Sequence, residues 1–140
     1  MKENNVLESQ LCFSLYSVAN ALTRQYRPIL KEFDLTYPQF IVLLALFEKD
    51  NISLKELSEK TLFDSGTLTP LVQKLEAKGF LNRISIDEDE RVKKVLLTEL
   101  AKNQEAKITD IPNQIRCGMS MDDTELTQLR LLALKLLGDL

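Results

Sequence analysis

The chain has 140 residues, of which 44% are apolar and 28% charged, and its net charge is −3. These values are typical of a single globular domain with its own core. There is no histidine, and there are only two cysteines and four glycines, which excludes histidine-based triads, four-thiolate metal sites and glycine-rich phosphate loops. The N-terminus is polar and no apolar run spans a bilayer, so we expect a cytoplasmic protein that is not an enzyme and holds no metal or cofactor.

Apolar residues recur at helical spacing over residues 6–33 in two neighbouring stripes. This pattern predicts a first helix that packs on more than one surface. The stripes are Leu11, Leu15, Val18 and Leu22, and next to them Cys12, Tyr16, Ala19, Thr23 and Tyr26. We expect Pro28 to bend or end this helix.

Three short helices are predicted next. Thr36 and Gln39 have the spacing of a capping box and precede a buried helix over residues 40–47. A turn at residues 50–51 leads to a second capping box, which begins at Ser53 and opens a helix that ends near residue 61. After a tight polar break, a helix over residues 65–78 carries Leu68, Leu71, Val72 and Leu75 on its inner face. Gly79 ends it.

Two strands over residues 80–84 and 92–97 are predicted to form a hairpin whose tip, residues 85–91, is too polar for a core. Thr98 then caps a helix that runs to about residue 111. Pro112 is expected to interrupt this helix, which can then resume through Cys117, and residues 112–118 are expected to be mobile. The last helix begins at residues 122–125, and its leucines form a continuous apolar face.

A short helix, a tight break and a second helix predict a helix-turn-helix unit. The early outward residues of its second helix must be small and polar to enter a major groove. Those residues, with a lysine placed for a phosphate, are Ser65, Thr67, Thr69, Pro70, Gln73 and Lys74. Ser and Thr at a helix start are also ordinary caps, so a protein-interaction module without DNA stays open.

The hairpin tip is interpreted as a wing. Arg91 is the best candidate for a minor-groove contact, and Asp89 could pair with it and fix its direction. Arg83 is a candidate for a backbone phosphate. Acidic residues 87–90 oppose binding unless the basic side chains offset them, and the stretch from residue 54 to 94 is neutral overall.

Cys12 lies in the first turns of its helix, where the N-terminal dipole favours a thiolate. Tyr16 lies one turn further on the same face, and Tyr26 lies on the same stripe. A phenol can donate a hydrogen bond to a thiolate. The alternative is that Cys12 is an inert small hydrophobe and the tyrosines only pack. Cys117 is a second thiol that could resolve a sulfenic acid.

The first and last helices carry more apolar surface than the core of one chain needs. Burial of that surface between two subunits is the natural solution. The predicted fold is mainly α with a small β-hairpin: a winged helix-turn-helix over about residues 36–98, dimerised through helices over about 6–33 and 99–140.

Four stretches together resemble the MarR family of bacterial regulators, and within it the organic hydroperoxide resistance repressors. They are QLCFSLY at 10–16, LTYPQF at 35–40, DSGTLTPL at 64–71 and DEDER at 87–91, with an extension at 97–99. The resemblance implies a homodimeric repressor that binds double-stranded DNA at a pseudo-palindromic operator. It also implies that Cys12 is the thiol that reacts with an organic hydroperoxide.

In relatives of this kind, Tyr26 and less directly Tyr16 and Tyr37 would match tyrosines that bind the reactive sulfur across the dimer. Cys117 lies where two-cysteine relatives place the thiol that forms an intersubunit disulfide, and oxidation then releases the operator. Strand residues 82–86 have fewer arginines than the resemblance leads one to expect. Rival hypotheses are a repressor that responds to another oxidant or to a small aromatic ligand, and a thiol peroxidase.

Overall fold

The computed structural model describes residues 6–86 and 89–140, with only the backbone described for residues 89–91. Seven helices and a three-stranded antiparallel sheet form within these ranges. In chain order they are α1 (Leu11–Lys31), α2 (Tyr37–Glu48), β1 (Ile52–Ser53), α3 (Leu54–Thr61), α4 (Ser65–Ala77), β2 (Leu81–Ile86), β3 (Asp89–Leu97), α5 (Glu99–Thr109), α6 (Ile111–Cys117) and α7 (Asp123–Gly138). The mainly helical fold with a small hairpin is therefore confirmed.

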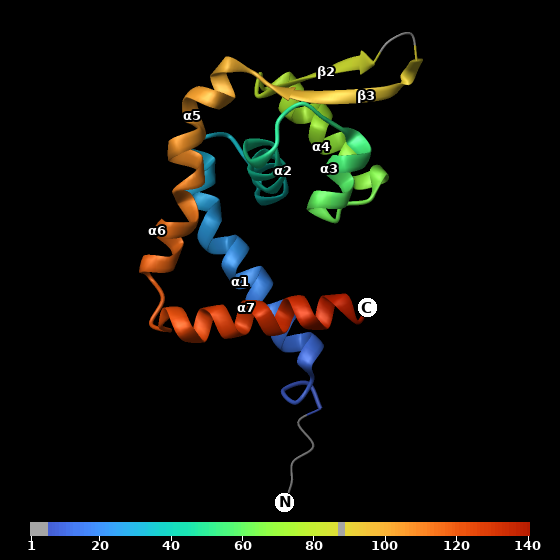
Figure 1. Cartoon of the computed structure of the whole chain (residues 1–140). Coiled ribbons are helices and arrows are strands. Elements are labelled where there is room, and N and C mark those ends of the chain that lie inside the picture. Colours follow the sequence, from blue (N-terminus) through green and yellow to red (C-terminus); the bar gives the residue numbers. More distant parts are fainter. Residues whose placement is uncertain (1–5, 87–88) are drawn as a thin grey trace, which may run out of the picture.

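The buried core lies in the unit formed by α2, α3, α4 and the sheet, with the C-terminal half of α1 and α5 against it (Figure 1). Helix α2 is apolar on all sides, as a helix enclosed by others must be. Its Phe40, Val42, Leu43 and Leu46 are at most 1% exposed. Each buried side chain of this size contributes about 1.5–3 kcal/mol through removal from water, so α2 is the centre around which the other elements pack.

Local signals account for most helix starts. The capping box at Thr36 and Gln39 is complete, because each side chain binds the main-chain N–H of the other residue. Ser53 accepts from the N–H of Glu56 at 3.1 Å. However, the Glu56 carboxylate binds Lys49 at 3.1 Å instead of closing a second box. A capping box that the sequence did not predict as such opens α7 at Asp122.

Several predicted boundaries are wrong. Helix α1 begins at Leu11 and contains Pro28 without ending there. The expected interruption near Pro112 is confirmed, because α5 ends at Thr109 and α6 begins at Ile111. Pro112 lies in the first turn of α6, where a proline loses no intrahelical hydrogen bond. Helix α6 then runs through Cys117, as expected. The hairpin is also longer than expected, and β1 adds a third strand that pairs with β3.

The residues that follow α3 and α4 both have positive φ angles. Gly79 ends α4 at φ 86°, as expected, whereas Leu62 ends α3 at φ 64° with its side chain 69% exposed. A left-handed conformation costs a residue with a side chain about 1–2 kcal/mol.

We expect Leu62→Gly to raise the free energy of unfolding by about 1 kcal/mol and the melting temperature by about 3 °C. Gly79→Ala serves as the comparator in thermal unfolding and is expected to shift both values in the opposite direction. A lower melting temperature for Leu62→Gly would contradict the argument from backbone strain.

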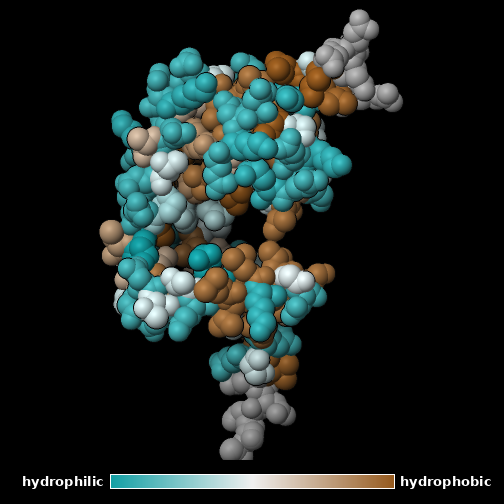
Figure 2. Space-filling view, viewed as in Figure 1, coloured by the Kyte–Doolittle hydropathy of each residue, from teal (hydrophilic) through white to brown (hydrophobic). Residues whose placement is uncertain are grey.

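The terminal helices leave the core. Helix α7 and the N-terminal half of α1 lie at the end of the molecule opposite the β2–β3 hairpin (Figure 1). No residue of α7 is buried in the single chain. Hydrophobic side chains gather on this part of the surface, apart from the core unit (Figure 2). None of the helices within the described ranges combines the length and apolar character that crossing a bilayer requires.

Candidate DNA-binding interface and redox site

Helix α4 has one buried and one exposed face. Leu68, Val72 and Leu75 are at most 1% exposed, and Asp64 caps the helix by accepting from the N–H of Thr67 at 2.8 Å. The opposite face holds the side chains that the sequence analysis proposed for DNA. Ser65, Thr67, Pro70, Gln73 and Lys74 are exposed, and Thr69 is half-buried. A helix with this face accessible is suited to entering a major groove.

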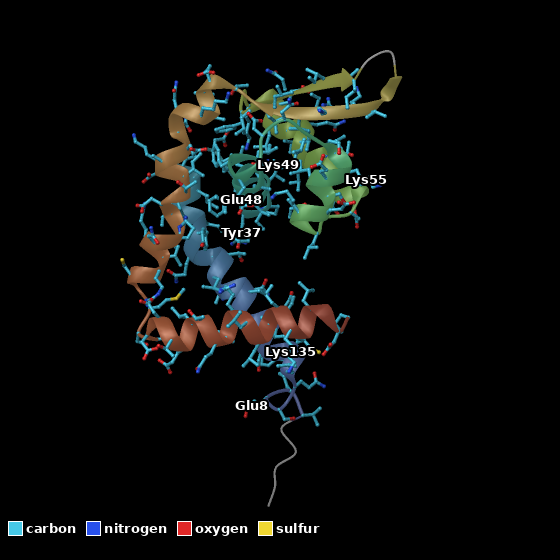
Figure 3. The ribbon with its side chains drawn as sticks, viewed as in Figure 1. Glu8, Tyr37, Glu48, Lys49, Lys55 and Lys135 are labelled. Atoms are coloured by element: carbon cyan, nitrogen blue, oxygen red, sulfur yellow. The ribbon has the colours of Figure 1, made fainter. Side chains whose placement is uncertain are left out.

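Helix α3 lies beside α4, and a cavity of about 480 Å³ opens between them. Ser65 and Thr69 contribute to its lining from α4, and Lys55 and Ser58 contribute from α3. Lys55 is exposed at the start of α3 (Figure 3). The sequence analysis did not single it out, although a lysine two residues after an N-cap, next to the exposed face of α4, is well placed for a phosphate.

Arg83 of β2 binds back to α4. Its Nε and Nη2 donate to Oε1 of Glu76 at 3.1 and 2.9 Å, and its main-chain N–H donates to Oε2 at 2.9 Å. The backbone hydrogen bond, then the guanidinium, lowers the pKa of Glu76, with a smaller contribution from Lys93. In this conformation Arg83 therefore connects β2 to α4, and its proposed phosphate contact stays a prediction. Glu76 is a residue that the sequence analysis missed.

We expect Glu76→Gln to lower the free energy of unfolding by about 1 kcal/mol at neutral pH. Because the pKa of Glu76 is lower in the folded state, its ionised form stabilises the fold above the unfolded-state pKa of about 4.5. That stability is lost as the pH falls through the folded-state value. Chemical unfolding of wild type and variant should differ most at pH 7 and converge below about pH 4. A difference that does not change with pH would contradict this role of the carboxylate.

The proposed tip contacts lie beyond what the structure describes. Residues 87 and 88 are outside the described ranges, and the side chains of Asp89 and Arg91 are not described. Their roles at the minor groove stay predictions.

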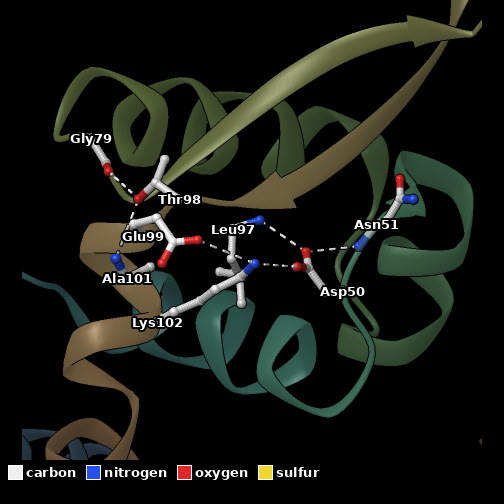
Figure 4. A network of polar contacts seen from close by, with 8 residues as sticks. All are labelled: Asp50, Asn51, Gly79, Leu97, Thr98, Glu99, Ala101 and Lys102. Atoms are coloured by element: carbon white, nitrogen blue, oxygen red, sulfur yellow. Dashed lines mark hydrogen bonds and ion pairs between the residues drawn. The ribbon is translucent and has the colours of Figure 1, made fainter.

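A polar network holds the base of the wing (Figure 4). Asp50, in the turn before β1, accepts from the N–H of Asn51 at 2.8 Å and from the N–H of Leu97 in β3 at 2.9 Å, and its carboxylate lies 3.9 Å from Lys102 of α5. Thr98 caps α5 and donates to the Gly79 oxygen at 2.6 Å. These contacts attach the end of β3 to the turn before β1 and connect that turn to α5.

Both thiols are exposed in the single chain. Cys12 is the second residue of α1, and Cys117 ends α6. Tyr16 is one turn from Cys12 and is 69% exposed. These side chains belong to the part of the molecule that lies outside the core.

Tyr26 lies in a different environment. It forms an aromatic cluster with Tyr37 and Phe40, with ring centroids 4.9 and 5.5 Å from its own. Burial raises the pKa of both tyrosines, and Tyr37 contributes to the shift of Tyr26. Both phenols therefore stay protonated at neutral pH and are able to donate a hydrogen bond. Figure 3 places Tyr37 on the side of the core unit that faces α7.

The sequence stripe that joined Cys12 to Tyr26 does not bring them together. They are 14 residues apart on one continuous helix, which separates them by about 21 Å along its axis. Tyr26 and Tyr37 can therefore reach a Cys12 sulfur only if it belongs to another chain.

The unit α3–turn–α4, followed by the β2–β3 hairpin, defines a winged helix-turn-helix protein. The comparisons place it more narrowly. The chain belongs to the family described as transcriptional regulator SarA/Rot, whose family model matches residues 24–111.

Two curated relatives extend this result. The chain is 39% identical over 124 residues to the organic hydroperoxide resistance transcriptional regulator of Bacillus subtilis, covering 89% of this chain and 84% of that protein. It is 41% identical over 119 residues to the HTH-type transcriptional regulator TtmR of Methylorubrum extorquens, covering 84% of this chain. The match spans only 61% of the length of TtmR. The resemblance to hydroperoxide resistance regulators is confirmed.

AbfR of Staphylococcus epidermidis has a similar fold. The reduced protein bound to DNA superposes with a TM-score of 0.83 at 29% identity, covering 99% of this chain and 96% of AbfR. Its disulfide form gives a TM-score of 0.69 at 29% identity, covering 94% and 92%. AbfR has also been solved in an overoxidised state bound to DNA, with a TM-score of 0.75 at 30% identity and 94% coverage of both chains.

Proposed function

We propose that this chain is a homodimeric repressor that binds double-stranded DNA when reduced and is released when an organic hydroperoxide oxidises Cys12. The observation that carries the DNA-binding part is the exposed polar face of α4, with Ser65, Thr67 and Gln73 accessible and Lys74 beside them. Gln can read adenine through two hydrogen bonds, and a Thr methyl can contact thymine. Such a regulator acts in the bacterial cytoplasm.

The unburied leucines of α7 support a dimer. Leu129, Leu131, Leu132, Leu134 and Leu137 are 45–65% exposed in the single chain. A helix that exposes this many leucines is stable in water only when other protein surface covers them. The N-terminal half of α1 exposes Leu11, Phe13 and Val18 as well. We therefore assign the surface of α1 and α5–α7 to a two-fold interface.

A two-fold dimer would present two copies of α4 to successive major grooves. The half-sites of a pseudo-palindromic operator should then lie about 10 bp apart. Both recognition helices must engage together for tight binding, so a change in their separation is sufficient to release the DNA.

The chemistry of the switch uses the two exposed thiols. The Cys12 thiolate attacks a hydroperoxide oxygen, the O–O bond breaks, the alcohol leaves after taking up a proton, and Cys12 becomes a sulfenic acid. The thiol of Cys117 in the partner then attacks the Cys12 sulfur, which forms a disulfide and expels water. Tyr26 and Tyr37, which cannot reach Cys12 in their own chain, would donate hydrogen bonds to the partner's sulfur.

The states in which AbfR has been solved support a disulfide as the releasing step. That protein is bound to DNA in its reduced and overoxidised states, so oxidation of AbfR does not by itself prevent DNA binding. The conformation of our chain gives a higher TM-score with the reduced DNA-bound form than with the disulfide form. We therefore assign the conformation of this chain to the DNA-binding state of the proposed switch.

The test is DNA binding followed by fluorescence anisotropy. A duplex selected from a random pool with the reduced protein is titrated before and after treatment with cumene hydroperoxide, with hydrogen peroxide and hypochlorite as comparison oxidants. We expect loss of binding, recovery with a reducing agent, and a band at dimer mass on a non-reducing gel. Absence of binding to any duplex at low salt would favour a protein-interaction module instead. Catalytic consumption of peroxide would favour the thiol peroxidase.

One cavity favours a second candidate function, a response to a small aromatic ligand. It has a volume of about 500 Å³ and lies between α1 and the start of α2. Its lining is Thr23, Arg27, Leu30, Leu35, Thr36, Tyr37 and Pro38. An arginine and a phenol beside apolar side chains are suited to an aromatic carboxylate. Release of DNA by salicylate from fully reduced protein would support this candidate.

A further inference from the structure

Lys78, which caps the C-terminal end of α4, connects the recognition helix to the corner between α1 and α2. Its Nζ donates to the main-chain oxygen of Asp34 and, at 2.9 Å, to Oε1 of Gln39, and it lies 3.8 Å from the Asp34 carboxylate. An ammonium has three N–H donors, and here three acceptors from one corner surround it. The Lys78 side chain is only 25% exposed, so most of this side chain is covered by protein.

The acceptor at Gln39 is held firmly. Gln39 is 2% exposed and is the only buried polar side chain within the described residues. Its Oε1 also accepts from the main-chain N–H of Thr36 at 3.1 Å, which completes the capping box of α2. Lys78 is therefore attached to the first turn of α2 through a buried group, and loss of the ammonium would leave that group with fewer partners.

The same corner leads to the candidate redox residues. Helix α1 runs into it from Cys12 and Tyr26, and α2 begins with Tyr37. Asp34 has φ 57°, and its N–H binds the Lys31 oxygen at 3.0 Å, so the corner is continuous with the end of α1. A displacement of α1 would therefore move the acceptors that hold the end of α4.

We infer that Lys78 is a positioning residue that holds α4 in the orientation that fits the operator and passes a displacement of the α1–α2 corner to α4. The DNA-binding test of this inference rests on the proposed function. Lys78 acts in this assignment without touching DNA, in contrast to the exposed Lys74 one turn earlier. The two lysines carry the same charge on the same helix, so their variants form a matched pair.

The test compares Lys78→Met with Lys74→Met on the selected duplex at several salt concentrations. We expect Lys78→Met to weaken binding of the reduced protein about tenfold, or about 1.4 kcal/mol, with an unchanged slope of log K against log salt. Lys74→Met should reduce the magnitude of that slope by about one, because a phosphate contact is lost. The affinity ratio between reduced and disulfide-linked protein should fall in Lys78→Met, since only the reduced state depends on the contact.

Gln39→Leu provides a second variant in which no charge is removed. It eliminates one of the three acceptors of Lys78, at a buried position that cannot meet DNA. We expect a smaller loss of affinity than in Lys78→Met, with the same salt slope as wild type. If Lys78→Met lowers the slope by about one, Lys78 contacts a phosphate and the inference is wrong. Unchanged affinity in both variants would also overturn it.

A measurement without DNA separates this inference from the proposed function. Nitroxide labels are placed on cysteines at Arg24 in α1 and Gln73 in α4, two exposed positions, in a chain that carries Cys12→Ser and Cys117→Ser. Labelled chains are diluted with unlabelled ones so that distances within one chain dominate. Lys78→Met should broaden the distribution of distances between the two labels. An unchanged distribution would overturn the inference even if DNA binding were confirmed. If the wild type binds no duplex, the proposed function fails while this measurement still decides the role of Lys78.

Discussion

Cys12→Ser is expected to leave operator binding by the reduced protein unchanged and to abolish its release by organic hydroperoxide. Cys12 is exposed near the start of α1, so the substitution disturbs no core packing. A serine hydroxyl is not oxidised by a peroxide, so the reactions that lead to the disulfide cannot begin. In the wild type we expect oxidation to weaken binding by about 100-fold, near the upper end of usual coupling free energies.

The measurement is anisotropy of the labelled duplex before and after cumene hydroperoxide, with wild type and variant at equal concentrations. Release of DNA from Cys12→Ser at the wild-type peroxide dose would show that the sensing group lies elsewhere. The aromatic ligand hypothesis would then become the leading one, because it needs no thiol.

Cys117→Ser is the matched control for the disulfide. Its Cys12 still forms a sulfenic acid, but no second thiol captures it, so the acid persists or is oxidised further. Because the proposed release depends on the disulfide, we expect oxidised Cys117→Ser to keep most of its DNA affinity. A band at dimer mass for this variant on a non-reducing gel would contradict the resolving role of Cys117.

Leu132→Glu is expected to convert the dimer to monomers and to weaken operator binding by more than about 100-fold. The Leu132 side chain is 65% exposed in the single chain, so a charge there is harmless to the monomer fold. In a dimer interface the same carboxylate would be buried without a partner, which costs several kcal/mol. A monomer engages one half-site alone and loses the gain from linked binding.

Sedimentation velocity measures the mass, and anisotropy with the selected duplex measures the affinity. Thr127→Glu is the control, because it adds the same charge to α7 at a residue that is polar and exposed already. If the Leu132→Glu variant stays dimeric and binds DNA with wild-type affinity, α7 is not part of the interface. Unfolding of the variant monomer, followed by circular dichroism, distinguishes a lost interface from a lost fold.

Much of the fold could be predicted because its signals are local. The caps at Thr36 and Ser53, the inner face of α4 and the positive φ at Gly79 each depend on residues within one or two turns. The exposed polar face of α4 follows from the same helical period. These features carry the winged helix-turn-helix interpretation, and the family match confirms it.

The errors and omissions concern long-range contacts. Strand β1 has two residues and exists only because β3 pairs with it. Likewise, the pairing of Arg83 with Glu76 competes with a role at phosphate that the charge alone suggested.

The sequence by itself therefore indicated the winged helix-turn-helix, the exposed polar face of α4 and the two candidate thiols, because helical periodicity and caps act over a few residues. Only the tertiary structure decided how these parts are connected. It separated Tyr26 from Cys12 along one rigid helix, grouped Tyr26 with Tyr37, and brought Lys78 to Gln39 across 39 residues of chain. Such contacts depend on how helices pack in three dimensions, which no local pattern records.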